Sequence, residues 1–284
     1  MSSTLESTVR CSLGSSLGLP AVVTPLGALF NCDCLRLLAA VATDSVDCVF
    51  ADPPFNLGKD YGRGTGADEL AERDYLAWSR EWLTECCRVL SPGGALFVYN
   101  LPRWLIPLGA FLMERLQLRH WIALTMKSTY PRGVRLYPAH YGLLYFTKGP
   151  PRVFHRLRVP VPACRHCGGD LKDYGGHRGA LNPAGLSLTD FWEDTSPVRH
   201  RKFKNRPANE LKPMVPRRAL EMSTDPFDLV LDPFGGGGST YEAAELAGSH
   251  WLGSELGDCR PIAERLRPFA TAGRLPEAVA RVLG

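Results

Sequence analysis

The sequence lacks any apolar run of the roughly 18 residues that a membrane-spanning helix requires. Its opening residues also lack the basic-then-apolar pattern of a secretion signal, which predicts a flexible tail over residues 1–21. The nine cysteines are an odd number and include the adjacent pair Cys86 and Cys87. This set is unlike a disulfide framework, so we expect a reducing, cytoplasmic location and no membrane partner.

Charge of one sign is present only in slight excess. Lys and Arg total 33 against 29 Asp and Glu, which gives a formal net charge of +4. This bias permits a polyanionic partner without requiring one. The chain has 284 residues, of which 45% are hydrophobic, enough for one large α/β domain or for a domain with a sizeable insertion.

Apolar segments of strand type alternate with segments of helical periodicity. The expected strands lie near residues 46–51, 95–100, 121–127, 141–149, 228–232 and 250–256. The expected helices lie near residues 74–90, 103–118, 213–223 and 239–248. This alternation predicts an α/β fold with a doubly wound, mostly parallel sheet.

Residues 150–207 interrupt this alternation, because they carry many Pro, Gly, Arg and His residues and show little periodicity. We interpret them as an irregular inserted segment. The chain is therefore expected to comprise the tail (1–21), a first half of the main domain (22–149), the inserted segment (150–207) and a second half (208–284).

A glycine-rich turn follows one expected strand, in the sequence LDPFGGGGST. Glycines there let the backbone approach a ligand closely, and the start of the next helix offers free N–H groups. The absence of Gly-Lys-Ser/Thr disfavours a Walker-type phosphate site. Glu255 lies at the end of the next strand and suits the two hydroxyls of a ribose. We predict a pocket for a nucleoside-containing cofactor, against the alternatives of a plain tight turn and a solvated acid. The residues predicted to bind the cofactor are Asp232, Phe234, Gly235, Gly236, Gly238, Ser239, Thr240 and Glu255.

A second strand runs into Asp52, Pro53, Pro54 and Phe55, which are the predicted catalytic residues. Asp52 can accept one hydrogen bond from an amino group, and the Pro53 carbonyl can accept another. Two acceptors on one amine draw its lone pair out of conjugation with an aromatic ring, which makes the nitrogen nucleophilic. The prolines stiffen the turn, and Phe55 can stack on the ring that carries the amine. The competing interpretation is a helix start with Asp52 as its N-cap.

The two strand ends, ADPPFNLGKDY and LDPFGGGGST, resemble the catalytic and cofactor motifs of the β-class amino-methylating DNA methyltransferases, which use S-adenosylmethionine. The catalytic motif precedes the glycine motif, as in the circularly permuted, Rossmann-like fold of that class. The resemblance extends over most of residues 25–260. It implies that Asp33, in NCDCLRLL, lies near the cofactor adenine. It also implies that the segment NELKPMVPRRALEMS helps to hold the methionine part of the cofactor.

The resemblance further implies site-specific methylation of double-stranded DNA, with the target nucleotide flipped out because a duplex buries its amine. Aspartate at the first position of the catalytic motif leans toward adenine N6 in that family. The alternatives are methylation of cytosine N4 and a non-catalytic DNA-binding subunit that retains the fold. A dinucleotide oxidoreductase is disfavoured, because its glycine loop would lie near the start of the chain. A cognate restriction endonuclease and a homodimer are partners compatible with this reading.

The end of the inserted segment is rich in Lys and Arg, since residues 198–218 contain a single acid. Such a cluster suits phosphate contacts, against the alternative of a solvated basic face. Cys164 and Cys167 form half of a zinc knuckle, but no second C-x2-C is present, so we expect two free thiols and no metal. The residues predicted to bind DNA are Arg199, Arg201, Lys202, Lys204 and Arg206.

Overall fold

One mixed sheet organises the fold. The structure, a computed structural model, describes residues 17–58, 69–126, 134, 136, 139–161, 163, 167–170, 175–176, 178–195, 211–270 and 275–283. Within these residues the strands of the sheet are β1 (Val22–Val23), β2 (Gly27–Phe30), β3 (Val46–Ala51), β4 (Leu90–Asn100), β5 (Gln117–Thr125), β6 (His140–Thr147), β9 (Phe191–Trp192), β10 (Leu229–Asp232) and β11 (His250–Ser254). Their spatial order is β1-β2-β11-β10-β3-β4-β6-β5-β9. The central run from β2 to β4 is parallel throughout, as the alternation of strands and helices predicts.

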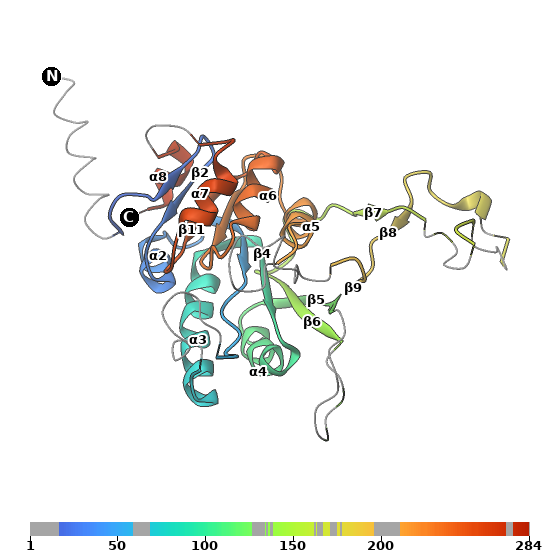
Figure 1. Cartoon of the computed structure of the whole chain (residues 1–284), viewed down its shortest axis with the longest axis horizontal. Helices are drawn as coiled ribbons and strands as arrows, with labels where there is room; N and C mark the ends of the chain where they lie inside the picture. The colour runs from blue at the N-terminus through green and yellow to red at the C-terminus, as the bar shows by residue number, and fades with distance from the viewer. Residues whose placement is uncertain are drawn as a thin grey trace.

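Helices cover both faces of this sheet (Figure 1). One apolar layer contains side chains of α2 (Cys34–Ala40), α3 (Glu72–Val89), α4 (Pro102–Met113) and α8 (Glu277–Val282). The other contains side chains of α5 (Met214–Ser223), α6 (Ser239–Ala247) and α7 (Arg260–Leu266). The prediction of a doubly wound α/β fold is therefore confirmed. No helix in the described part of the chain is long and apolar enough to cross a membrane.

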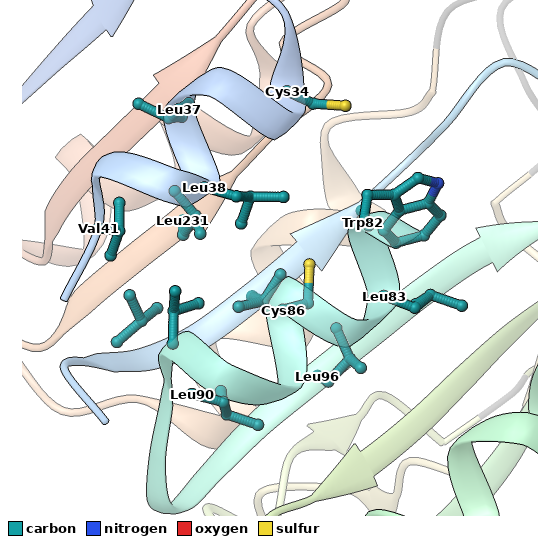
Figure 2. Packing of buried hydrophobic residues seen from close by; sticks show 14 of the residues in the cluster. Cys34, Leu37, Leu38, Val41, Trp82, Leu83, Cys86, Leu90, Leu96 and Leu231 are labelled. Atoms are coloured by element: carbon teal, nitrogen blue, oxygen red, sulfur yellow. The ribbon is translucent and has the colours of Figure 1, made fainter. Parts of the chain in front are cut away.

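The layer beneath α2 and α3 shows how apolar burial fixes these helices on the sheet. Figure 2 shows Leu38 of α2 and Cys86 of α3 close to Leu231 of β10. All three side chains are fully buried. Burying a leucine side chain contributes on the order of 1.5–3 kcal/mol relative to leaving it exposed. This packing therefore holds β10 and α3 in a defined relation.

The centre of the sheet contains a topological switch point. β3 and β10 are parallel neighbours, with Leu231 paired to Val49. After β3 the chain passes through α3 to β4 on one side, and after β10 it passes through α6 to β11 on the other side. Connections that leave two adjacent strands in opposite directions open a crevice at their carboxyl ends. The two strand-end motifs border this crevice.

Two expected boundaries differ from the structure. The helix expected near 103–118 ends at Met113, and β5 begins four residues later at Gln117. The strand expected from residue 95 begins at Leu90, so the Ser-Pro-Gly-Gly segment lies inside β4. Neighbouring backbone explains this extension, because the Gly93 amide donates to the Lys148 carbonyl and the Lys148 amide donates to Gly94. Pairing with an adjacent strand thus overrides the local turn signal of proline and glycine.

The described part of the inserted segment has two different relations to the main domain. Its small sheet, β7 (Arg158–Val159) with β8 (Leu186–Ser187), lies on an arm that projects away from the helices and strands (Figure 1). Its last strand, β9, returns to the edge of the main sheet beside β5. There Trp192 is buried, Arg218 of α5 lies 5.3 Å from its ring centre, and the Arg218 guanidinium donates to both Asp194 oxygens at 2.8 and 2.7 Å. The domain boundaries at residues 22, 150 and 208 stay predictions.

Candidate functional site

The two strand-end motifs meet in one pocket. Pairing of Leu231 with Val49 places the residues that follow β10 beside those that follow β3. The pocket is lined by Asp52, Leu211, Asp232, Phe234, Gly235, Gly236, Gly237, Ser239, Thr240 and Arg265. The structure therefore brings Asp52 of the predicted catalytic motif together with most of the residues predicted to bind a cofactor. Gly238 adjoins this set as the N-cap of α6.

Backbone hydrogen bonds shape the glycine turn. The Gly235 amide donates to the Ser254 carbonyl at 2.8 Å, and the Gly238 amide donates to the Gly235 carbonyl at 2.8 Å. Gly238 has φ of +78°, a left-handed conformation that favours glycine. A Cβ on Gly235 would lie 2.8 Å from the Tyr241 hydroxyl oxygen. The turn therefore packs too closely on the buried Tyr241 side chain to leave room for a side chain at position 235.

Asp232 is a buried carboxyl at the base of this pocket, with 2% of its surface exposed. One of its oxygens accepts from the Phe234 amide at 2.9 Å. The pKa of Asp232 is raised to about 8, chiefly by burial and to a smaller extent by the nearby carboxylates of Asp52 and Glu255, while hydrogen bonds from Thr240 and Phe234 act in the opposite direction. The pocket thus holds a carboxyl that retains a proton over much of the neutral range.

We expect Asp232 to make stability depend on pH. The folded protein keeps a proton on this carboxyl between its ordinary pKa of 3.8 and the folded value of about 8, whereas the unfolded chain has released it. The stabilising contribution is therefore complete below pH 3.8 and is lost as pH rises toward 8, by at most about 1.4 kcal/mol per pH unit. Urea unfolding between pH 5 and 9 should show a shallower decline for Asp232→Asn than for the wild type. Equal slopes for the two proteins would contradict the assignment.

The Asp-Pro-Pro-Phe segment contributes Asp52 to the pocket lining, and its Phe55 packs against two tyrosines. Val98 pairs with Ala51, so Tyr99 lies level with Asp52 at the strand ends. The Phe55 ring lies 5.6 Å from Tyr99 and 5.7 Å from Tyr141, and these two tyrosines are 5.3 Å apart. Tyr99 and Tyr141 are buried, with 4% and 7% of their surface exposed, so they support the half-buried Phe55 ring, which keeps exposed aromatic surface near the Asp52 carboxylate. Neither tyrosine was predicted from the sequence, although the aromatic residue before Asn100 at a strand end is a usable signal.

Comparison with known proteins assigns a family to this arrangement. A family model described as DNA methylase, of the N6/N4 type, matches residues 46–260. The chain belongs to this family.

Two type II methyltransferases resemble this N6/N4 DNA methylase over most of its length. It is 48% identical over 249 residues to the type II methyltransferase M.BamHI of Bacillus amyloliquefaciens, covering 87% of this chain and 59% of that protein. It is 31% identical over 209 residues to M.HpaI of Haemophilus parainfluenzae, covering 72% of this chain and 62% of that protein. The chain therefore spans less than two thirds of the length of these two relatives.

Solved structures show the same fold. The PvuII DNA methyltransferase, described as cytosine-N4-specific, matches with a TM-score of 0.60 and 19% identity over 93% of both chains. The M1.HpyAVI–SAM complex matches with a TM-score of 0.56 and 17% identity, covering 85% of this chain and 99% of that one. These likenesses confirm the predicted Rossmann-like methyltransferase sheet, and the family match confirms the resemblance from which it was inferred.

Two residues of this N6/N4 methylase that were predicted to bind the cofactor, Glu255 and Asp33, do not line the pocket, and each accepts hydrogen bonds from backbone amides. Both Glu255 oxygens accept backbone amides at 2.7 Å, one from Gly236 and one from Gly257. Glu255 thus braces the glycine turn. Asp33 is the N-cap of α2 and accepts from the Leu35 amide at 2.9 Å. Contact of Glu255 with a ribose and of Asp33 with an adenine stay predictions.

Arg265, which lines the pocket from α7, was not predicted from the sequence. Its Nε donates to the Gly237 carbonyl at 2.6 Å, and a terminal nitrogen donates to Glu242 of α6 at 2.6 Å. The guanidinium therefore ties the glycine turn to the helix that follows it. No local signal marks this residue, because it lies 28 positions after Gly237.

Several predicted residues lie outside the described part of the chain. These are Arg199, Arg201, Lys202, Lys204 and Arg206, together with Cys164 of the C-x2-C pair. Cys167 is described and is exposed. Among the residues that the structure describes, no cluster of three or more His, Cys, Asp or Glu side chains could hold a metal ion.

Proposed function

We propose that this protein is a site-specific DNA methyltransferase that transfers a methyl group from S-adenosylmethionine to the exocyclic amine of a flipped base. The observation that carries the proposal is the pocket shared by Asp52 and the glycine turn. Membership of the N6/N4 DNA methylase family supports it. The reaction class fits the site, because a methyl donor and an amine acceptor must meet within bond-forming distance.

The glycine turn fits S-adenosylmethionine. The backbone of Gly235, Gly236 and Gly237 lines the pocket without side chains, and α6 begins directly after Gly238. We propose that Gly235, Gly236 and the first residues of α6, Ser239 and Thr240, hold the methionine part, whose carboxylate suits a helix N-terminus. Asp33 is proposed for the adenine on the strength of the resemblance, and Glu255 is proposed for the ribose because an acid at this strand end suits its two hydroxyls.

The Asp52 segment prepares the acceptor amine. S-adenosylmethionine, when bound, supplies a methyl group made electrophilic by a positively charged sulfur. Asp52 and the Pro53 carbonyl accept the two amino hydrogens and turn the nitrogen lone pair toward that methyl group. The half-buried Phe55 ring, supported by Tyr99 and Tyr141, provides aromatic surface for the flipped base. The nitrogen then forms its bond to carbon as the carbon–sulfur bond breaks, and it releases a proton afterwards, so Asp52 need not act as a strong base.

Duplex DNA is the proposed substrate. The basic run that ends the inserted segment supports this choice, because it carries the cations that phosphate contacts require. We propose that Arg199, Arg201, Lys202, Lys204 and Arg206 make such contacts. A cytoplasmic location, a cognate restriction endonuclease and a homodimer fit a type II modification enzyme and are proposed with it.

The acceptor base has two candidates. Adenine N6 is favoured by the aspartate at the first position of the catalytic motif. Cytosine N4 is the second candidate, because the PvuII enzyme, described as cytosine-N4-specific, shares the fold. Both amines present two hydrogens to Asp52 and Pro53, so the proposed mechanism serves either base.

Expression in a host that lacks DNA methylation tests the function. Genomic DNA is digested to nucleosides and analysed by mass spectrometry, and modified positions are mapped by sequencing. We expect N6-methyladenine, or N4-methylcytosine for the second candidate, at one recurring sequence. A chain carrying Asp52→Ala serves as the control. Unmodified DNA from cells that contain folded wild-type protein would overturn the proposal, and retained binding of S-adenosylmethionine would then identify a non-catalytic subunit.

A further inference from the structure

The Asp-Pro-Pro-Phe segment is held by its carbonyl groups. Pro53 and Pro54 have no N–H, so this stretch offers few backbone donors to its surroundings. Two of its carbonyls accept side-chain donors instead. The Tyr75 hydroxyl donates to the Pro54 carbonyl at 2.7 Å, and Trp104 Nε1 donates to the Phe55 carbonyl at 2.8 Å. The carbonyls of two consecutive residues, Pro54 and Phe55, are thus each held by a hydrogen bond from a large aromatic side chain.

Tyr75 is itself oriented by a buried amide. Asn100, which is fully buried at the end of β4, donates from Nδ2 to the Tyr75 hydroxyl at 2.9 Å. The other amide atom, Asn100 Oδ1, accepts from the Leu101 backbone at 2.7 Å. Since a backbone amide can only donate, this contact determines which side-chain atom faces Tyr75. The tyrosine oxygen therefore accepts one hydrogen bond and donates the other to Pro54.

Tyr75 and Trp104 pack against each other and together support the Asp-Pro-Pro-Phe segment. Their rings lie 4.6 Å apart, and their side chains come from different helices, α3 and α4. Both residues are almost fully buried. This aromatic packing extends to the glycine-rich turn, because the Trp78 ring centre lies 5.8 Å from that of Tyr75 and 5.9 Å from that of Phe234. One aromatic layer thus supports both strand-end motifs.

We propose that Tyr75 and Trp104 are positioning residues for methyl transfer. They hold the Pro54 and Phe55 carbonyls, and through them the placement of the Asp52 carboxylate and the Pro53 carbonyl. This inference rests on the proposed function, in which those two acceptors orient the target amine. Displacing a reacting group by about 1 Å can slow a reaction by on the order of 10²-fold. A neutral hydrogen bond, in contrast, adds only modestly to folding.

Removal of each hydrogen-bond donor tests this assignment. Tyr75→Phe keeps the ring and removes the donor to Pro54, and Trp104→Phe removes the donor to Phe55. We expect the single-turnover rate of methyl transfer to fall by roughly tenfold or more in each variant. The dissociation constant for S-adenosylmethionine, measured by titration calorimetry, should change by less than about twofold, because neither side chain lines the pocket.

Tyr145→Phe is the matched control. Tyr145 is buried in the same sheet on β6, and its hydroxyl has no hydrogen-bond partner among the described residues. It undergoes the same chemical change without losing a contact, so the transfer rate should stay within about twofold of the wild type.

The outcomes separate this inference from the proposed function. Wild-type protein that neither binds S-adenosylmethionine nor methylates DNA would refute the proposed function. An active wild type with unchanged rates in Tyr75→Phe and Trp104→Phe would overturn the positioning role. A parallel loss of rate, cofactor affinity and melting temperature in both variants would also overturn it, because that pattern indicates a merely structural role.

Discussion

Asp52→Ala is expected to lose methyl transfer while it still binds S-adenosylmethionine. In the proposed mechanism the carboxylate is the charged acceptor for the target amine, and its removal leaves the Pro53 carbonyl as the remaining acceptor of the pair. Loss of one preorganised hydrogen-bonding group at a reacting atom costs on the order of 10²–10³-fold in rate. Single-turnover assays with labelled cofactor measure the rate, and calorimetry measures the cofactor affinity, which should change only a few-fold.

Asp52→Asn is the informative companion variant. Its side-chain oxygen still accepts a hydrogen bond, but it carries no charge. We therefore expect a smaller loss of rate than in Asp52→Ala, since charge-assisted hydrogen bonds are roughly twice as strong as neutral ones. A parallel loss of cofactor binding and methyl transfer in both variants would mean that Asp52 is structural.

Gly238→Ala is expected to weaken binding of S-adenosylmethionine by roughly tenfold or more. Gly238 begins α6 with φ of +78°, where a side chain costs about 1–2 kcal/mol of backbone strain. A Cβ there would also lie 3.0 Å from Ile262 and 3.4 Å from Arg265. Relief of this crowding must move the glycine turn or α7, and a 1.4 kcal/mol loss of binding free energy corresponds to about tenfold in affinity.

Gly248→Ala provides a matched control at the other end of the same helix. Gly248 caps α6 with φ of +71°, and a Cβ there would meet no atom within 4 Å. The two variants share the backbone strain, and Gly238→Ala adds the crowding against Ile262, so denaturant unfolding should show a loss of stability in both that is at least as large in Gly238→Ala. Only Gly238→Ala should lose cofactor affinity. Equal affinities in the two variants would show that the turn does not bind the cofactor.

Sequence alone could predict the chemistry of the two strand ends, because each motif is contiguous. Asp52 to Phe55 and the glycine turn carry their signals in neighbouring residues. The sequence also predicts parallel strands from their continuous apolar character. It could not predict that β3 and β10 are direct neighbours, since strand order is decided by packing between segments about 180 residues apart, as in the contact of the Leu229 amide with Asp47.

The supporting residues were not predictable for the same reason. Tyr75 lies 21 positions from Pro54, and Trp104 lies 49 positions from Phe55. In the sequence both look like the apolar face of an ordinary helix. For Asp33 and Glu255 the sequence predicted ligand contacts, whereas the hydrogen bonds that they accept from backbone amides became visible only in the structure. A carboxylate at a strand end can brace a loop as readily as it can contact a ligand.

The anchoring of β9 bears on any exchange of the inserted segment between related enzymes. Exchange of residues 150–207 as a whole assumes that the segment is separable from the main domain. The end of the segment contains β9, which is a strand of the main sheet. Trp192 and Asp194 there contact Arg218 of α5. A chimera that keeps β9 and replaces only the part that carries β7 and β8 preserves the main sheet. A chimera that replaces everything up to residue 207 loses β9 from the edge of that sheet.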